Sequence, residues 1–170
     1  MKDLVKKAGL EDQFQIASAA TSSEEIGNPV YPPARRKLAE HGISCSGKIA
    51  RQLRREDYGK YDLLIGMDQA NIRNIRRICG GDPEGKIHLL MEYAGCRKGS
   101  PRESSETGRV GRGGTREHSG FSPQAETERR VPCFDEVADP WYTGDFETTW
   151  RDVLAGCQGL LKILTEESAK

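Results

Sequence analysis

The stretch YDLLIGMDQANIRNIRRICGGDPEGKIHLLM, residues 61–91, decides the fold. Residues 61–67 and 86–91 each contain a short apolar run, which predicts two buried strands. Between them, Asp68 can cap a helix, and Gly80 with the glycine after it can close that helix. Because strands that alternate with helices are typical of a parallel sheet, the stretch predicts an α/β fold.

The same pattern extends outward in both directions. Residues 1–13 have the apolar spacing of the end of a helix, and residues 13–21 alternate as a strand does. A further helix is expected to begin at Pro32 and to end at Gly42, which suits a left-handed cap. A long amphipathic helix is expected near the C-terminus, with an inner face formed by Trp150, Val153, Leu154, Leu160 and Leu161.

One segment does not fit this pattern. Residues 96–136 are rich in Gly, Ser, Arg and Glu and contain very few large apolar residues. Such a segment buries too little surface to offset the entropy lost on ordering, so it is predicted to be a disordered insert. The expected domain is therefore formed by residues 1–95 and 137–170.

Composition excludes several classes of protein. Lys+Arg and Asp+Glu balance at 26 each, so no overall charge favours a nucleic-acid or membrane partner. No apolar run approaches the roughly 18 residues that span a bilayer. Five cysteines, an odd number without a Cys-x-x-Cys pair, argue against a disulfide framework or a metal site. These features favour a reduced, cytoplasmic protein.

Several blocks resemble the low-molecular-weight protein tyrosine phosphatase family. The blocks are IASAATSSEEIGNPVYPPARRKLAEHGI, ARQL, EDYGKYDLLIGMDQANIRNIRRI, KIHLL and VADPWYTGDFETTW, in the order that the family has them. The last is the most specific. The resemblance implies a small three-layer α/β fold, like that of phosphotyrosine protein phosphatase I, with helices on both faces of a four-stranded parallel sheet.

The resemblance also implies a reaction through a phosphocysteine, without metal or organic cofactor, on a phosphotyrosine-containing protein or an aryl phosphate. In the family, the thiolate lies in a C-x5-R-[ST] loop whose N–H groups and arginine hold the phosphate. Asp139 matches the general acid that protonates the leaving phenolate. Trp141 and Tyr142 match the substrate-binding positions that line the pocket beside the leaving group.

The family's first strand and nucleophile loop should precede Leu4, and they are absent from this sequence. That strand is central in the family's sheet, so its loss removes two ladders of hydrogen bonds. Residues 13–21 are then expected to lack a neighbour, at a cost close to the whole stability of a typical domain. The chain is accordingly expected to resemble a truncated phosphatase that is inactive by itself.

Two other cysteines formally satisfy C-x5-R, Cys45 with Arg51 and Cys96 with Arg102. Neither arginine is followed by Ser or Thr, and neither cysteine follows an apolar strand, so both are interpreted as ordinary thiols. An alternative function is a non-catalytic interaction protein on a degenerate phosphatase scaffold. An arsenate reductase would need further redox cysteines, and RNA binding by residues 97–130 is disfavoured by their interspersed glutamates.

Overall fold

The structure is a computed structural model that describes residues 1–95 and 136–167. The expected disorder of residues 96–136 lies, except for Glu136, outside the described residues. The elements follow in the order α1 (Lys2–Lys7), η1 (Glu11–Gln13), α2 (Pro32–Glu40), α3 (Asp57–Lys60), β1 (Leu64–Gly66), α4 (Gln69–Cys79), β2 (Ile87–Leu89), η2 (Leu90–Tyr93), α5 (Pro140–Thr143) and α6 (Phe146–Glu167).

The β1–α4–β2 unit confirms the central expectation. The two strands are parallel, and Leu64, Ile65 and Gly66 pair with Ile87, His88 and Leu89 in that order. The Asp68 carboxylate accepts a hydrogen bond of 2.6 Å from the Asn71 N–H, which caps α4.

Helix α4 ends at Gly80, whose φ of +84° is a left-handed conformation that favours glycine. The same device ends α2, because Gly42 has a φ of +69°. Both predicted helix ends are therefore confirmed.

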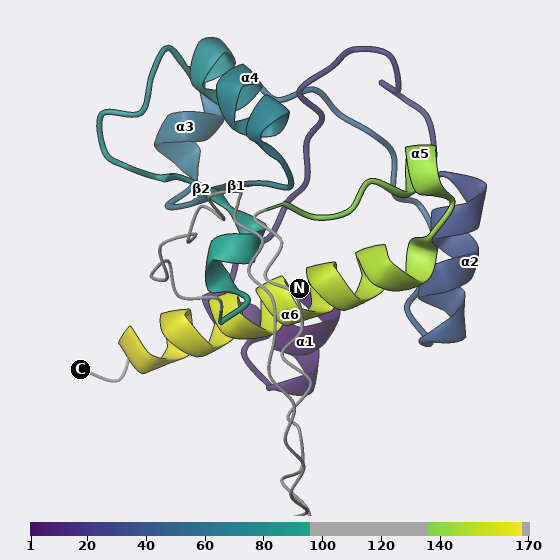
Figure 1. Ribbon diagram of the computed structural model, residues 1–170. Helices are drawn as coiled ribbons and strands as arrows, with labels where there is room; N and C mark the ends of the chain where they lie inside the picture. The colour runs from purple at the N-terminus through teal and green to yellow at the C-terminus, as the bar shows by residue number, and fades with distance from the viewer. Residues whose placement is uncertain (96–135, 168–170) are drawn as a thin grey trace, which may run out of the picture. The chain divides into compact units, whose positions relative to one another are not determined.

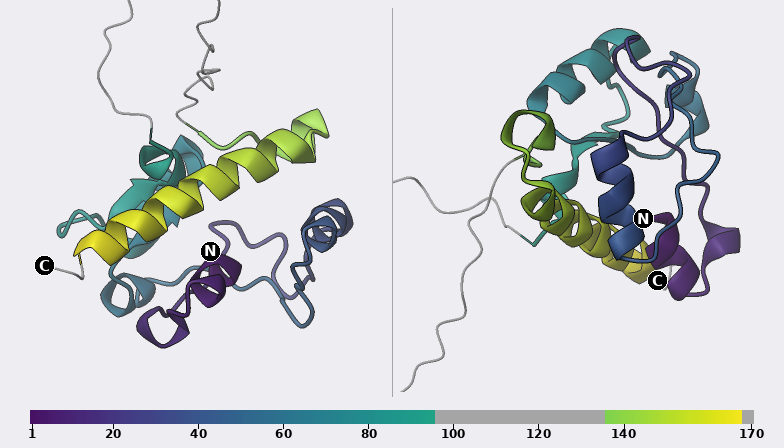
Figure 2. Two further views of the ribbon diagram at one scale, coloured as in Figure 1. Left: turned by 90° about the horizontal axis from the view of Figure 1, so that it is seen from below. Right: turned by 90° about the vertical axis from the view of Figure 1, so that its right-hand side faces the viewer.

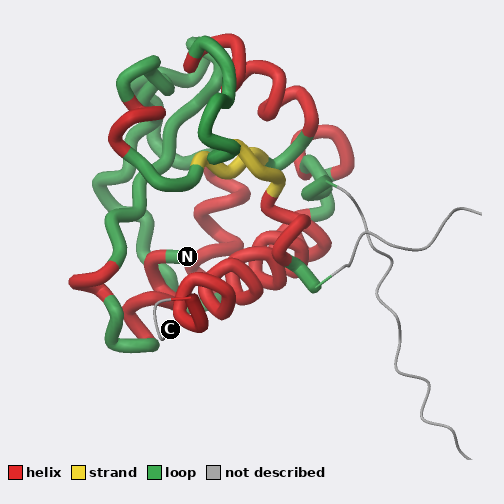
Figure 3. The backbone as a smooth tube through the Cα atoms, turned by 90° about the vertical axis from the view of Figure 1, so that its left-hand side faces the viewer, coloured by secondary structure: helices red, strands yellow, loops and turns green. Residues whose placement is uncertain are grey.

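The core lies between α4 and the sheet. It is a cluster of buried apolar side chains, against which Leu53 and Tyr58 pack: Leu64, Ile72, Ile75, Cys79, Ile87 and Leu89. Figure 1 shows α3 and α4 on one side of the strands and α6 on the other, so the chain has the layers of the expected α/β fold. In Figure 3 the two strands, drawn in yellow, lie between helices, drawn in red.

Helix α6 forms the second layer. Leu90 of η2 is 2% exposed and packs against α6 at Gly156, while Gly159 lies against the backbone of Tyr93. Helices α1 and α2 also contact α6, as Figure 2 shows, and Val5 of α1 is buried to 2% exposure. Of the predicted inner face, Leu160 is buried, while the other four residues are half-buried.

The predicted strand over residues 13–21 is wrong. Gln13 ends the short helix η1, and Ala20 alone forms a bridge, with Gln52. The Ala20 N–H donates to the Arg51 carbonyl at 2.8 Å, and its own carbonyl accepts from the Leu53 N–H at 2.9 Å. A strand is stable only when a neighbour satisfies its backbone groups, and the described residues provide one at this single point.

Candidate active site

The block DPWYTGDF, residues 139–146, contains the capping residue of α5, that short helix, and the first residue of α6. Asp139 caps α5, and its Oδ1 accepts from the Trp141 N–H at 2.9 Å. Gly144 ends α5 with a φ of +70°. Asp145 Oδ1 accepts from the N–H groups of Glu147 and Thr148 at 3.1 and 2.9 Å, so α6 begins directly afterwards.

The backbone before Asp139 is attached to the carboxyl end of β1. The Val137 N–H donates to the Met67 carbonyl at 2.9 Å. Glu136 Oε1 accepts from the Gln69 N–H, at the start of α4, at 3.0 Å. The carboxyl ends of parallel strands are the usual location of ligand sites in open α/β sheets. Asp139 is therefore held at the edge where such a site is expected.

Helix α6 fixes the same loop from the other side. Asp152 is 7% exposed, and its Oδ2 accepts from the Ala138 N–H at 3.2 Å. The Thr149 hydroxyl donates to the Ala138 carbonyl at 2.7 Å. The sequence analysis missed both residues. The available signal was an aspartate on the inner side of an otherwise apolar helix, which needs a buried hydrogen-bond partner.

Aromatic side chains lie beside the Asp139 loop. The rings of Tyr31 and Trp141 have centroids 5.2 Å apart with an interplanar angle of 51°, and Tyr31 lies 6.3 Å from Phe146. Trp141 is 68% exposed and Tyr31 is 47% exposed, so they present an apolar surface to solvent. Tyr31, directly before α2, was not predicted. Tyr142 lies in α5, and its side chain is outside the described residues.

Two contacts attach α2 to the start of α6. The Lys37 ammonium pairs with Glu147 of α6 and with Glu40 of its own helix. These bonds, Glu147 first, raise the pKa of Lys37, and Lys37 in turn lowers the pKa of Glu147. His41 stacks on Trp150 with ring centroids 3.8 Å apart and planes within 6°. Together they hold Tyr31 close to Trp141.

Three cysteines lie within the described ranges. Cys79 and Cys157 are buried, and burial raises the pKa of the Cys79 thiol, with smaller effects from Asp57 and Asp82. A buried thiol of raised pKa is a poor nucleophile. Cys96 lies outside the described residues.

Cys45 is half-buried, and its carbonyl accepts from the Lys48 N–H in a turn rather than leading into a helix. Arg51, its C-x5-R partner, donates to the Asp57 carboxylate from both terminal nitrogens of its guanidinium group, at 2.8 and 3.1 Å. The geometry therefore agrees with the interpretation of Cys45 as an ordinary thiol.

Metal sites and membrane-spanning helices are both absent from the described part of the chain. Among residues 1–95 and 136–167, no group of three or more His, Cys, Asp or Glu side chains could hold a metal ion. In the same part of the chain, no helix has the length and apolar character needed to cross a bilayer.

Comparison with protein families gives one match to the sequence. The family model described as "Low molecular weight phosphotyrosine protein phosphatase" matches residues 1–104. The protein-tyrosine-phosphatase YfkJ of Bacillus subtilis is 28% identical over 166 residues, which cover 98% of this chain and 84% of that protein. The human low molecular weight phosphotyrosine protein phosphatase is 36% identical over 94 residues.

Coverage differs between these relatives. The human match covers 54% of this chain and 59% of the human protein, so the chain matches a little over half the length of that relative. Among solved structures, YfkJ superposes with a TM-score of 0.72 over 98% of this chain and 82% of its own. The Streptococcus pyogenes phosphatase SP-PTP, also 28% identical, gives 0.61 over 90% and 75%.

Proposed function

The chain belongs to the low molecular weight phosphotyrosine protein phosphatase family, and on that premise we propose that it is the acid half of a phosphotyrosine phosphatase. In this proposal Asp139 is the general acid and base, and Trp141 and Tyr142 line the substrate pocket. In the same proposal residues 1–170 do not supply the nucleophile, and by themselves they do not hydrolyse phosphate esters. The described cysteines are free thiols, typical of a reducing compartment, and we place the protein in the cytoplasm.

The observation that carries the proposal is the position of Asp139. Hydrogen bonds at Val137 and Ala138 join its loop to β1 and to α6, while the Asp139 side chain itself remains exposed. An exposed carboxyl group on a fixed backbone, beside the Tyr31–Trp141 pair, suits proton transfer to an aromatic leaving group.

The proposed chemistry has two steps. A cysteine thiolate attacks phosphorus and forms a phosphocysteine, while Asp139 gives its proton to the departing phenolate oxygen. The Asp139 carboxylate then takes a proton from water, whose oxygen attacks phosphorus and releases inorganic phosphate and the thiolate. An arginine and backbone N–H groups must balance the phosphate charge. None of the described cysteines is in such a setting, because Cys79 and Cys157 are buried and Arg51, the C-x5-R partner of Cys45, is already paired with Asp57.

The test compares 1–170 with the same chain carrying an apolar strand and a Cys-x5-Arg-Ser loop before Met1. Both are assayed with an aryl phosphate. Residues 1–170 are expected to give the background rate, and the extended chain a measurable one. In the extended chain, Asp139→Asn retains the Oδ1 cap but cannot transfer a proton, so kcat is expected to fall about 10²–10⁴-fold. Asp145→Asn, at the neighbouring cap, serves as the matched control.

Turnover by unextended 1–170 that disappears in Cys45→Ser and Asp139→Ala would contradict the proposal. A second candidate is a non-catalytic interaction protein, which the 68% exposure of Trp141 favours. The two candidate functions can be distinguished by measuring whether residues 1–170 unfold cooperatively and sediment as a compact species. A functional scaffold must be a folded protein by itself, whereas an incomplete enzyme need not be.

A further inference from the structure

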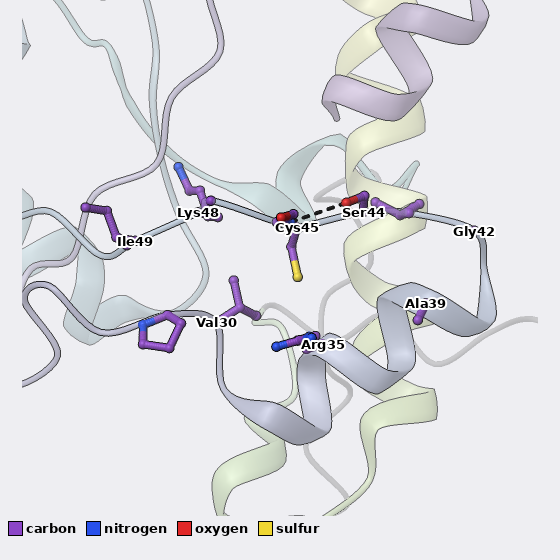
Figure 4. Close-up of a pocket in the computed structure, with 12 residues that line it drawn as sticks. Val30, Arg35, Ala39, Gly42, Ser44, Cys45, Lys48 and Ile49 are labelled. Carbon is purple, nitrogen blue, oxygen red and sulfur yellow. Dashed lines mark hydrogen bonds between the residues drawn. The ribbon is translucent and has the colours of Figure 1, made fainter.

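A cavity of about 530 Å³ lies between α2 and the loop of residues 42–49, remote in sequence from Asp139 (Figure 4). Its volume is within the range of small-molecule sites, roughly 300–1,000 Å³. The lining residues are Pro29, Val30, Arg35, Ala39, Gly42, Ile43, Ser44, Cys45, Ser46, Gly47, Lys48 and Ile49. They include two cations and no carboxylate.

Backbone hydrogen bonds hold the walls in place. Ile43 N–H donates to the Leu38 carbonyl at 2.9 Å, which fixes the loop to the end of α2. On the opposite wall, Pro29 and Ile49 form an antiparallel bridge, and the Ala50 N–H donates to the Asn28 carbonyl at 2.9 Å. Two walls of this open cavity are therefore formed by hydrogen-bonded segments.

The charges that line the cavity have no internal partner. Within the described part of the chain, neither Arg35 nor Lys48 lies in ion-pair distance of a carboxylate, whereas Lys37, on the same helix as Arg35, has two. In Figure 4 the Arg35 guanidinium and the Cys45 sulfur both point into the space beside Val30. Val30 and Ile49 supply apolar surface, and Ile49 is 61% exposed.

We propose that this cavity binds a small organic anion, with its charged group at Arg35 and its apolar body against Val30 and Ile49. A carboxylate or sulfonate on a compact aromatic or branched body meets both requirements. Arginine offers a planar pair of donors to such a group. The proposal does not depend on catalysis by Asp139.

The first measurement is a ¹⁹F NMR titration of the full chain with 4-fluorobenzoate and with neutral 4-fluorobenzamide. Saturable binding of the carboxylate is expected, at least about threefold tighter than that of the amide, because one unit charge at about 6 Å in water contributes a factor of about three. Arg35→Gln, at an exposed position, should remove the preference. Arg73→Gln on α4 deletes the same charge elsewhere and should leave it intact.

The rate at which Cys45 is alkylated shows whether the ligand binds in this cavity. 4-Fluorobenzoate should slow the alkylation of Cys45 by neutral iodoacetamide, as followed by peptide mass spectrometry, and it should do so at lower concentration than the amide. Urea-unfolded chain should show no protection. The proposal is overturned if the carboxylate does not bind saturably, if Arg73→Gln weakens binding as much as Arg35→Gln, or if bound carboxylate leaves Cys45 alkylation unchanged.

Discussion

Gly159 on α6 gives a sharp test of how the second layer packs. A Cβ added there would overlap the Tyr93 carbonyl oxygen and lie 2.7 Å from its carbonyl carbon. Both atoms belong to the backbone of η2, which cannot rotate away as a side-chain end can. Overpacking of this kind costs about 1–3 kcal/mol, and the backbone contact favours the upper end. Alanine returns about 1 kcal/mol of helix propensity, so Gly159→Ala should destabilise by about 2 kcal/mol.

The assay is urea unfolding followed by circular dichroism at 222 nm. With a slope of about 2 kcal/mol/M, the expected loss corresponds to a midpoint about 1 M lower. Gly59→Ala is the matched control, because a Cβ on Gly59 in α3 would meet no atom within 4 Å. This control should be neutral or slightly stabilising. Equal midpoints for the two variants would show that η2 does not pack on α6 as the structure has it.

Two further predictions concern buried carboxylates. Arg51 lowers the pKa of Asp57, with help from the Arg54 N–H and against the effect of burial. The Asp57 carboxylate therefore stabilises the fold above pH 3.8, and this contribution is lost as the pH falls through its folded pKa. The stability difference between the parent and Asp57→Asn, measured by urea unfolding from pH 7 to pH 2.5, should therefore shrink below pH 4; a constant difference would contradict the pairing. Asp152→Ala leaves the Ala138 N–H without its acceptor and should cost about 1–3 kcal/mol, whereas Asp152→Asn retains an acceptor oxygen and should cost less, as the same assay can measure.

Local signals in the sequence predicted the longer helices well, whereas the four-residue helices α3 and α5 were not predicted. The Asp68 cap and the Gly80 stop each depend on residues within one turn of the helix end, so the sequence contains the whole determinant of α4. The β1–α4–β2 unit followed from apolar runs on either side of that helix. The same reasoning failed over residues 13–21, because alternation predicts a strand only where another strand lies beside it.

Only part of the candidate site could be predicted from the sequence. The family resemblance indicated Asp139 and Trp141, which are neighbours in sequence. Tyr31 is far from Trp141 along the chain, and no local sequence pattern indicates that the centroids of their rings lie 5.2 Å apart. Asp152 was likewise hidden, since its partner is a backbone N–H of the Asp139 loop. Contacts that depend on tertiary packing leave little trace in a single sequence.

Asp139 caps α5, and the proposed function gives the same carboxyl group a second role as an acid. Its Oδ1 accepts from the Trp141 N–H, and this bond fixes the orientation of the group. Its other oxygen, Oδ2, has no hydrogen bond within the described residues and is free to contact a ligand. The bonds that hold the loop come from β1, α4, α5 and α6, all of them within this chain. The Asp139 loop is therefore held without contacts from a nucleophile loop, so the strand and loop added in the test above need to supply only the nucleophile and the phosphate-binding groups.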